Sequence, residues 1–181
     1  MKKEKLGPLR EVYSGILFKI LQRDVSFSDG TTKLFEYCVR PNSVTILPFD
    51  SKGRLLLIRE RRHGYDKDVW FLPAGKVDEG ESPMQAAKRE LREETGFGAR
   101  VVKKIYEKSP SPTLHWDIHI YAAKDLYMAP LTGDEENPIK VVPTPFSKAL
   151  QMALDGTIKN EFISFHIIKF NYMIKHGQFK W

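Results

Sequence analysis

Residues 75–97, which read GKVDEGESPMQAAKRELREETGF, predict a helix whose two ends are both defined by the sequence. Ser82 is a suitable N-cap, Pro83 can occupy the first helical position, and Gln85 completes an S-x-x-Q capping box. Gly96 is a typical residue for the C-terminal end of a helix. We therefore expect a helix that begins at Pro83 and ends just before Gly96, and the rest of the chain must pack around it.

This helix carries more negative charge than a surface helix needs. Met84, Ala87 and Leu91 recur at i, i+3 and i+7 and predict a buried stripe. Glu90 and Glu94 are like charges at i and i+4, which costs about 0.2–0.5 kcal/mol unless something lies between them. A divalent cation between the two carboxylates would make their arrangement stabilising instead of destabilising. Ligands that are all oxygen atoms favour Mg²⁺ or Mn²⁺ over zinc. The surrounding segment holds six carboxylates in a chain of formal net charge +6: Asp78, Glu79, Glu81, Glu90, Glu93 and Glu94.

Strand patterns lie on both sides of the helix. Residues 11–37 read as strands that turn at 28–31, and a second hairpin is expected where SVTILPF and RLLLIRER flank the turn at 50–53. Residues 114–124 alternate as one strand, with Trp116 on the apolar side. Two helices follow near the C-terminus. This order predicts an α+β fold, a mixed α/β sandwich, and not a series of alternating βαβ units.

A length of 181 residues and an apolar content of 41% suit one ordinary domain with a core of its own. The basic N-terminal residues lack the apolar stretch of a signal peptide, and no segment is long and apolar enough to span a membrane. The single cysteine, Cys38, cannot form an intrachain disulfide, which favours a cytoplasmic protein. The basic residues are scattered, which argues against a nucleic-acid partner and fits attraction of an anionic small molecule.

The segment resembles the box of the Nudix hydrolase family, G-x5-E-x7-R-E-U-x-E-E-x-G-U, where U is a bulky apolar residue. The resemblance implies a Nudix-type α/β/α sandwich with a mixed sheet and a loop–helix–loop catalytic motif. It also implies a pyrophosphohydrolase that acts on a nucleoside diphosphate linked to another moiety. The charge of a pyrophosphate repels a nucleophile, so an acidic cluster that holds Mg²⁺ fits this chemistry. Every specified position of the box is filled: Gly75, Glu81, Arg89, Glu90, Leu91, Glu93, Glu94, Gly96 and Phe97.

The resemblance implies a metal site on this helix. Glu90 and Glu94 would be the principal ligands of Mg²⁺, with Mn²⁺ as a substitute, and Glu93 would assist directly or through water. The backbone carbonyl of Ala74 or Gly75 would be a further ligand, and glycine at this position lets the backbone approach closely. We expect Glu94 to be exposed, so that Glu94→Gln would stop turnover without disturbing the fold.

The resemblance also implies further catalytic residues. Arg89 would hold the glutamates in orientation, and Glu81 would support the loop. The general base of this fold usually comes from a mobile acidic loop late in the chain, and LTGDEENP at 131–138 fits in place and composition. Glu135 and Glu136 are both candidates, and the sequence does not choose between them. The alternative is that this acidic loop is simply solvated.

The residues around the box resemble the ADP-ribose and nucleoside diphosphate sugar hydrolases of the family. Pro112 lies fifteen residues after Phe97, a spacing that marks this subgroup, although an ordinary turn proline explains it equally well. The subgroup implies a phosphate-binding arginine at the strand end before the box. Arg62 matches this arginine, Glu60 departs from the usual glutamine, and Arg59 is a second candidate. The expected products are a nucleoside monophosphate and a sugar phosphate.

Other parts of the chain bear on substrate and assembly. Trp116 and Tyr37 are candidate contacts to the nucleobase, with core packing as the alternative for Trp116. We divide the chain into a β-rich segment over residues 1–40 and a Nudix domain over residues 41–181. The subgroup implies that the N-terminal strands pair with a second protomer in a homodimer. Dinucleoside polyphosphates, nucleoside triphosphates and mRNA caps are alternative substrates, and a non-catalytic nucleotide-sensing module is a further alternative.

Overall fold

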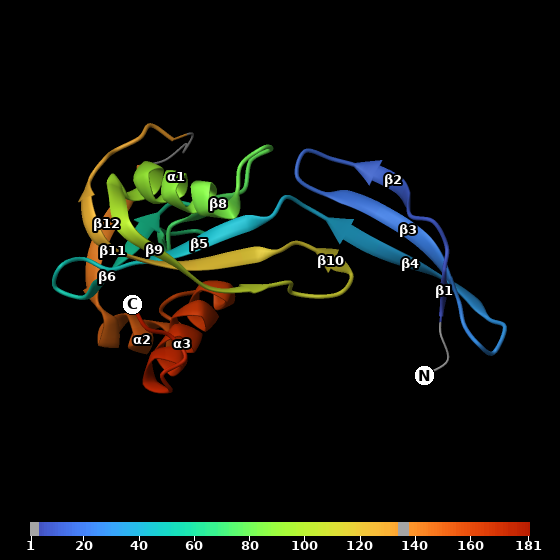
Figure 1. Ribbon diagram of the computed structural model, residues 1–181. Coiled ribbons are helices and arrows are strands. Elements are labelled where there is room, and N and C mark those ends of the chain that lie inside the picture. Colours follow the sequence, from blue (N-terminus) through green and yellow to red (C-terminus); the bar gives the residue numbers. More distant parts are fainter. Residues whose placement is uncertain (1–3, 134–137) are drawn as a thin grey trace. The chain divides into compact units, whose positions relative to one another are not determined.

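The computed structural model describes residues 4–133 and 138–181 (Figure 1). The chain forms two compact units. The first comprises the chain up to Asn42 together with Lys108–Ile118, and the second comprises Ser43–Glu107 and His119–Trp181. The predicted boundary after residue 40 stays a prediction, but the sequence did not indicate that Lys108–Ile118 would join the N-terminal strands.

The first unit is one sheet. Its order is β1-β3-β4-β10, with β2 paired to β3. The predicted hairpin with its turn at 28–31 is confirmed, because β3 and β4 pair in antiparallel register from Ser26↔Thr32 to Lys19↔Val39. β10 pairs in parallel with β4. The strands are β1 (Lys5–Leu6), β2 (Arg10–Ser14), β3 (Lys19–Ser26), β4 (Thr32–Val39) and β10 (Leu114–His115).

The second unit contains two further sheets and three helices. One sheet has the order β8-β5-β11-β9 and the other has the order β12-β6-β7. The strands are β5 (Ser43–Pro48), β6 (Arg54–Glu60), β7 (Val69–Phe71), β8 (Ala74–Lys76), β9 (Phe97–Lys108), β11 (Ile118–Met128) and β12 (Lys140–Pro145). The helices are α1 (Pro83–Thr95), α2 (Phe146–Leu154) and α3 (Glu161–Lys175).

The helices cover both sides of these strands. Figure 1 shows α1 on one side and α2 with α3 on the other, so the predicted α/β/α sandwich is confirmed. α1 packs on β5 and β8, and α2 packs on α3 and on β12. The core beneath α1 includes Ala87 and Leu91 of the predicted stripe, with Met84 partly buried against it. Of the helices in the described ranges, none has the length and apolar character to cross a membrane.

Both ends of α1 are as the sequence predicts. The Ser82 side chain accepts a hydrogen bond from the backbone of Gln85, and the Gln85 side chain accepts one from the backbone of Ser82. Gly96 has φ 76°, in the left-handed region where glycine is least strained. These local contacts fix where the acidic face of the helix begins and ends.

The predicted hairpin of SVTILPF and RLLLIRER is wrong beyond its turn. The turn at Asp50 and the antiparallel bridge Phe49↔Leu55 beside it are present, but β5 and β6 belong to different sheets. Every residue of β5 is buried, and β6 is buried on both faces over Leu55–Ile58. Strands covered on both faces belong inside the sandwich, where each pairs with other partners, β5 with β8 and β6 with β7 and β12.

The predicted continuous strand over residues 114–124 is also wrong. It breaks at Trp116 and Asp117, between β10 and β11. The backbone of Asp117 donates to the Asn42 side chain at 2.9 Å instead of to a strand neighbour. Trp116 is therefore half-buried within the first unit, with the guanidinium of Arg40 4.1 Å from its ring centroid, and does not continue the buried side of β11.

Candidate active site

The guanidinium of Arg89 is the centre of an acidic network on α1. It donates to Glu81 at 2.9 and 3.1 Å, to Glu90 at 2.7 Å and to Glu93 at 2.9 Å. It also donates to the backbone carbonyl of Lys76 at 2.9 Å, which joins the loop before the helix to the helix itself. Hydrogen bonding to Glu81 is the largest influence that raises the pKa of Arg89, and the same contact lowers the pKa of Glu81. One cation thus holds three carboxylates by hydrogen bonds, and a fourth, that of Asp78, lies 3.4 Å from it.

Glu94 lies apart from this network and is buried, with only 5% of its surface exposed. Its Oε2 accepts a hydrogen bond from the backbone of Ala74 at 2.8 Å, and Arg62 lies 3.7 Å from its other oxygen. Burial raises the pKa of Glu94 well above its ordinary value, and the negative charges of Glu90 and Glu60 raise it further. The expectation that Glu94 is exposed is therefore wrong.

Glu90 is buried against the backbone of β8. A Cβ placed on Gly75 would lie 1.9 Å from Oε1 of Glu90, so only glycine leaves room for this carboxylate. β8 is fixed in turn by its pairing with β5, in which Val44 opposes Gly75. The close approach of backbone and carboxylate puts the peptide oxygens of β8 near the acidic face of α1.

Arg62 and Glu60 are the charged neighbours of Glu94 from the end of β6 and the residues after it. Glu60 is 7% exposed at the end of β6, and it accepts a hydrogen bond from Nε of Arg62 at 2.5 Å. The guanidinium also lies 4.0 Å from the ring centroid of Phe71. Sequence reasoning noted Glu60 only as a departure from glutamine. Strand alternation could have found it, because Glu60 shares a face with the buried residue Ile58.

The donors present fit a hard divalent cation. Among residues 4–133 and 138–181, no group of three or more His, Cys, Asp and Glu side chains is arranged to hold a metal ion. Glu90 and Glu94 are nevertheless buried carboxylates one turn apart, and burial raises the pKa of Glu94, so a cation between them would stabilise their charged forms. Two carboxylates and a neighbouring backbone carbonyl are oxygen ligands of the kind that Mg²⁺ accepts.

The predicted substrate residues fall into separate groups. Arg62 lies beside Glu94, whereas Arg59 is on the opposite face of β6, over the ring of Trp70. Tyr37, Pro112 and Trp116 belong to the first unit. Glu135 and Glu136, the predicted candidates for the general base, lie outside the described residues.

A cavity of about 400 Å³ in the first unit contains two of these predicted residues, Pro112 and Trp116. Arg40 also lines it, and sequence reasoning missed this residue. Its Nε is buried without a hydrogen-bond partner among the described residues, and burial lowers the pKa of its guanidinium. The sequence gives little indication that Arg40 lines a cavity, because this position depends on the pairing of β10 with β4.

Comparison with known proteins identifies the class. The NUDIX domain family matches residues 39–154, and the chain belongs to this family. It is 34% identical to ADP compounds hydrolase NudE of Escherichia coli (strain K12), over 77% of this chain and 76% of that protein. It is 28% identical to ADP-ribose pyrophosphatase of Bacillus subtilis (strain 168), over 82% of each chain. A crystal structure of an ADP compounds hydrolase aligns with a TM-score of 0.82 and 28% identity, covering 99% of this chain and 98% of the other.

Proposed function

We propose that this Nudix hydrolase cleaves the pyrophosphate bond of nucleoside diphosphate sugars of the ADP-ribose type, with Mg²⁺ as its cofactor. Water adds to one phosphorus, the bridging P–O bond breaks, and the products are a nucleoside monophosphate and a sugar phosphate. The names of the relatives support this substrate class, since they include ADP-ribose pyrophosphatase and ADP compounds hydrolase. A fold shared with these relatives would not by itself define the substrate.

The proposal rests on the different surroundings of the carboxylates that Arg89 holds and of Glu94. Arg89 orients Glu81, Glu90 and Glu93, while the buried Glu94 accepts a backbone hydrogen bond from Ala74 and lies 3.7 Å from Arg62. We assign Glu90 and Glu94 as the metal ligands, with Glu93 and the carbonyl of Ala74 as further donors. A bound divalent cation supplies neutralisation of the pyrophosphate and a lowered pKa for a coordinated water.

Other residues of this chain would bind and orient the substrate. The guanidinium of Arg62 is held by Glu60 and Phe71, which leaves its outer nitrogen to donate to a phosphate oxygen. Tyr37, Pro112 and Trp116 remain our candidates for contacts to the nucleoside. We keep Glu135 and Glu136 as the candidates for the residue that accepts the proton of the attacking water.

Product analysis tests the proposed reaction. The enzyme is incubated with ADP-ribose, ADP-glucose, GDP-mannose and a diadenosine polyphosphate, each with and without Mg²⁺. We expect Mg²⁺-dependent release of a nucleoside monophosphate, with ADP-ribose among the best substrates. Exclusive cleavage of the diadenosine polyphosphate would contradict the substrate class, and equal rates in EDTA would contradict the metal requirement.

We also propose a cytoplasmic homodimer that forms through the N-terminal strands. Apolar side chains of this unit are exposed in the single chain, with Val12 51%, Tyr13 59% and Leu34 53% accessible, and a second protomer would cover them. The unpaired Cys38 is compatible with a reducing compartment. Light scattering that gives the mass of one chain at working concentration would contradict the dimer.

A further inference from the structure

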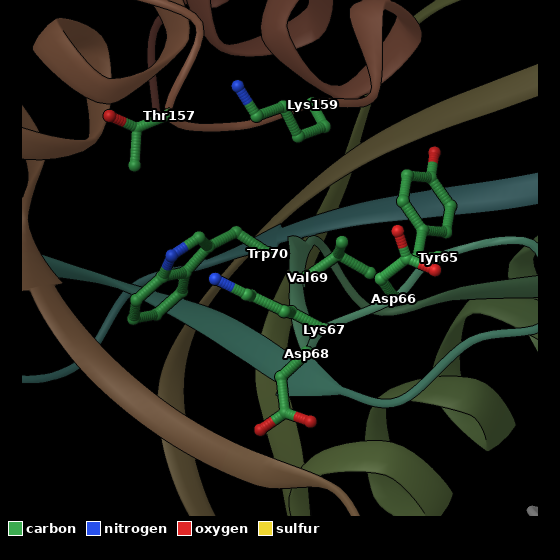
Figure 2. A pocket seen from close by; sticks show the side chains of 8 residues that line it. All are labelled: Tyr65, Asp66, Lys67, Asp68, Val69, Trp70, Thr157 and Lys159. Carbon is green, nitrogen blue, oxygen red and sulfur yellow. The ribbon is translucent and has the colours of Figure 1, made fainter.

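A second cavity lies in the second unit, between the β6–β7 connection and the segment that joins α2 to α3. Its volume is about 340 Å³. Figure 2 shows Trp70 and Lys67 on one wall and Thr157 and Lys159 on the other. Tyr65 closes one end of the cavity in this view. Two separate stretches of chain therefore place aromatic and cationic side chains around one space.

This cavity is distinct from the carboxylate site because none of the residues that line it belongs to the acidic network on α1, and its indole, that of Trp70, lies on the face of β7 opposite to Phe71. On β7, Val69 and Phe71 are buried, and Phe71 contacts Arg62 on the side of Glu94. Trp70 lies between them in sequence and so points to the other face. Its register partner on β6 is Arg59, whose guanidinium is 5.5 Å from the centroid of the indole. The cavity thus opens on the side of the sheet that α2 and α3 cover.

The charge around the cavity favours an anion. Lys67 and Lys159 are exposed and form no ion pair within the described part of the chain. Of the two carboxylates in the lining, Asp68 is 3.8 Å from Arg59 and is partly neutralised by it. Lys140 is the register partner of Arg59 on the other side of β6, which adds a further positive charge to this face. The remaining carboxylate, Asp66, does not balance these cations.

The volume of the cavity and its aromatic side chains restrict the kind of ligand that fits. A volume of about 340 Å³ is at the lower end of the range for small-molecule sites and suits a single ring system with one charged group. The half-buried indole of Trp70 and the ring of Tyr65 offer flat apolar surface. Stacking on such a surface is stabilising for any nucleobase. Lysine ammonium groups are suitable partners for phosphate oxygens.

We propose that this cavity is a second ligand site, separate from the carboxylates on α1, that binds a mononucleotide. The base stacks on Trp70, and the phosphate is held by Lys67 and Lys159. Thr157 supplies a hydroxyl donor at the same wall. The site requires neither the divalent cation nor Arg62, so binding there is independent of the proposed hydrolysis.

Calorimetric titration with AMP in EDTA tests this site. The protein carries Arg62→Ala, so that phosphate binding beside Glu94 does not contribute. We expect AMP to bind. Adenosine lacks the phosphate and inorganic phosphate lacks the base, so each should bind at least tenfold more weakly than AMP. The double variant Lys67→Glu/Lys159→Glu should raise the Kd for AMP at least tenfold. A matched control, Lys5→Glu/Lys52→Glu, makes the same change in net charge at two exposed positions elsewhere and should change the Kd less than twofold.

The indole resonances of the three tryptophans locate the ligand. The Trp70 signal, assigned with Trp70→Phe, should shift on addition of AMP in the Arg62→Ala protein, while the other two indole signals stay in place. Loss of all AMP binding in Arg62→Ala, an unchanged Kd in Lys67→Glu/Lys159→Glu, or a shift confined to Trp116 or Trp181 would each overturn the proposal. None of these results depends on turnover, so failure of the second site is distinguishable from failure of the proposed function.

Discussion

The carboxylate of Glu90 occupies the space where position 75 would carry a side chain, since a Cβ on Gly75 would lie only 1.9 Å from Oε1. Gly75→Ala should therefore displace this ligand or β8 itself. A displacement of about 1 Å in a catalytic group can cost about 100-fold in rate, and we expect a loss of kcat of that order. Steady-state kinetics on the hydrolysed nucleotide sugar measures it.

A second substitution separates this effect from general damage to the fold. Glu90→Asp shortens the side chain by one carbon and should relieve part of the clash in the double variant Gly75→Ala/Glu90→Asp. The effects of the two substitutions should then be clearly non-additive, as expected for residues in direct contact. If the changes in activation free energy of Gly75→Ala and Glu90→Asp were strictly additive, the contact between these two positions would not limit catalysis.

Glu94→Gln separates stability from function. Glutamine keeps an acceptor for the Ala74 backbone and removes a buried charge whose pKa is raised by burial. In EDTA near neutral pH, we expect the variant to be at least as stable as the wild type in urea unfolding, although its turnover should be lost. Mg²⁺ at 100 times its Kd should stabilise the wild type by about 2.7 kcal/mol and the variant much less. Equal stabilisation of both proteins by Mg²⁺ would remove Glu94 from the ligand set.

Arg89→Lys tests the orienting role of the guanidinium. A lysine ammonium cannot reproduce the forked contacts to Glu81, Glu90 and Glu93 at once. We expect kcat to fall about tenfold or more with a smaller change in KM, since Arg89 acts through the glutamates. Arg92→Lys is a matched control on the same helix, because Arg92 donates to the carbonyl of Ala129 instead of to the acidic network. Similar losses in both variants would indicate general destabilisation of α1.

Local and long-range features were predictable to different degrees. The ends of α1 follow from Ser82, Gln85 and Gly96, whose contacts lie within a few residues of one another, so the sequence alone was sufficient. The separation of β5 from β6 and the parallel pairing of β10 with β4 depend on partners far away in the chain. No local pattern encodes such pairings.

The same distinction applies to the site. The box identifies the acidic residues on α1, and Arg89 contacts Glu90 and Glu93 as expected. Its contact with Glu81 and the separate position of Glu94 were not predicted. The burial of Glu94 and Glu60 was not predicted, because it depends on how β6 and β8 pack against the helix. The opposite orientation of Arg59 and Glu60 follows from strand alternation and could have been stated from sequence, whereas Arg62 lies beyond the end of β6.

Asp50→Asn should produce a pH-dependent loss of stability. Burial acts to raise the pKa of Asp50, but hydrogen bonds from the backbone and side chain of Arg54 and from the backbone of Lys52 outweigh it and lower the pKa. A lowered pKa in the folded state contributes stability above the ordinary value of 3.8, and this contribution is lost as the pH falls through the folded pKa. The wild type should exceed the variant by at most about 1 kcal/mol at neutral pH. Urea unfolding from neutral pH to below pH 3.8 measures the difference, which should shrink on acidification; a constant difference would contradict the ion pair with Arg54.

Arg62→Ala and Arg59→Ala test which face of β6 meets the pyrophosphate. Arg62 is held by Glu60 and lies 3.7 Å from Glu94, whereas Arg59 points to the other side of the sheet. Loss of a charged hydrogen bond to phosphate costs about 1.5–3 kcal/mol, so Arg62→Ala should raise KM by roughly ten- to 100-fold. Arg59→Ala should have a much smaller effect on KM, because its guanidinium is separated from the carboxylates by the sheet itself. Initial rates over a range of ADP-ribose concentrations distinguish the two variants, and a larger rise in KM for Arg59→Ala would place the substrate on the side of Trp70.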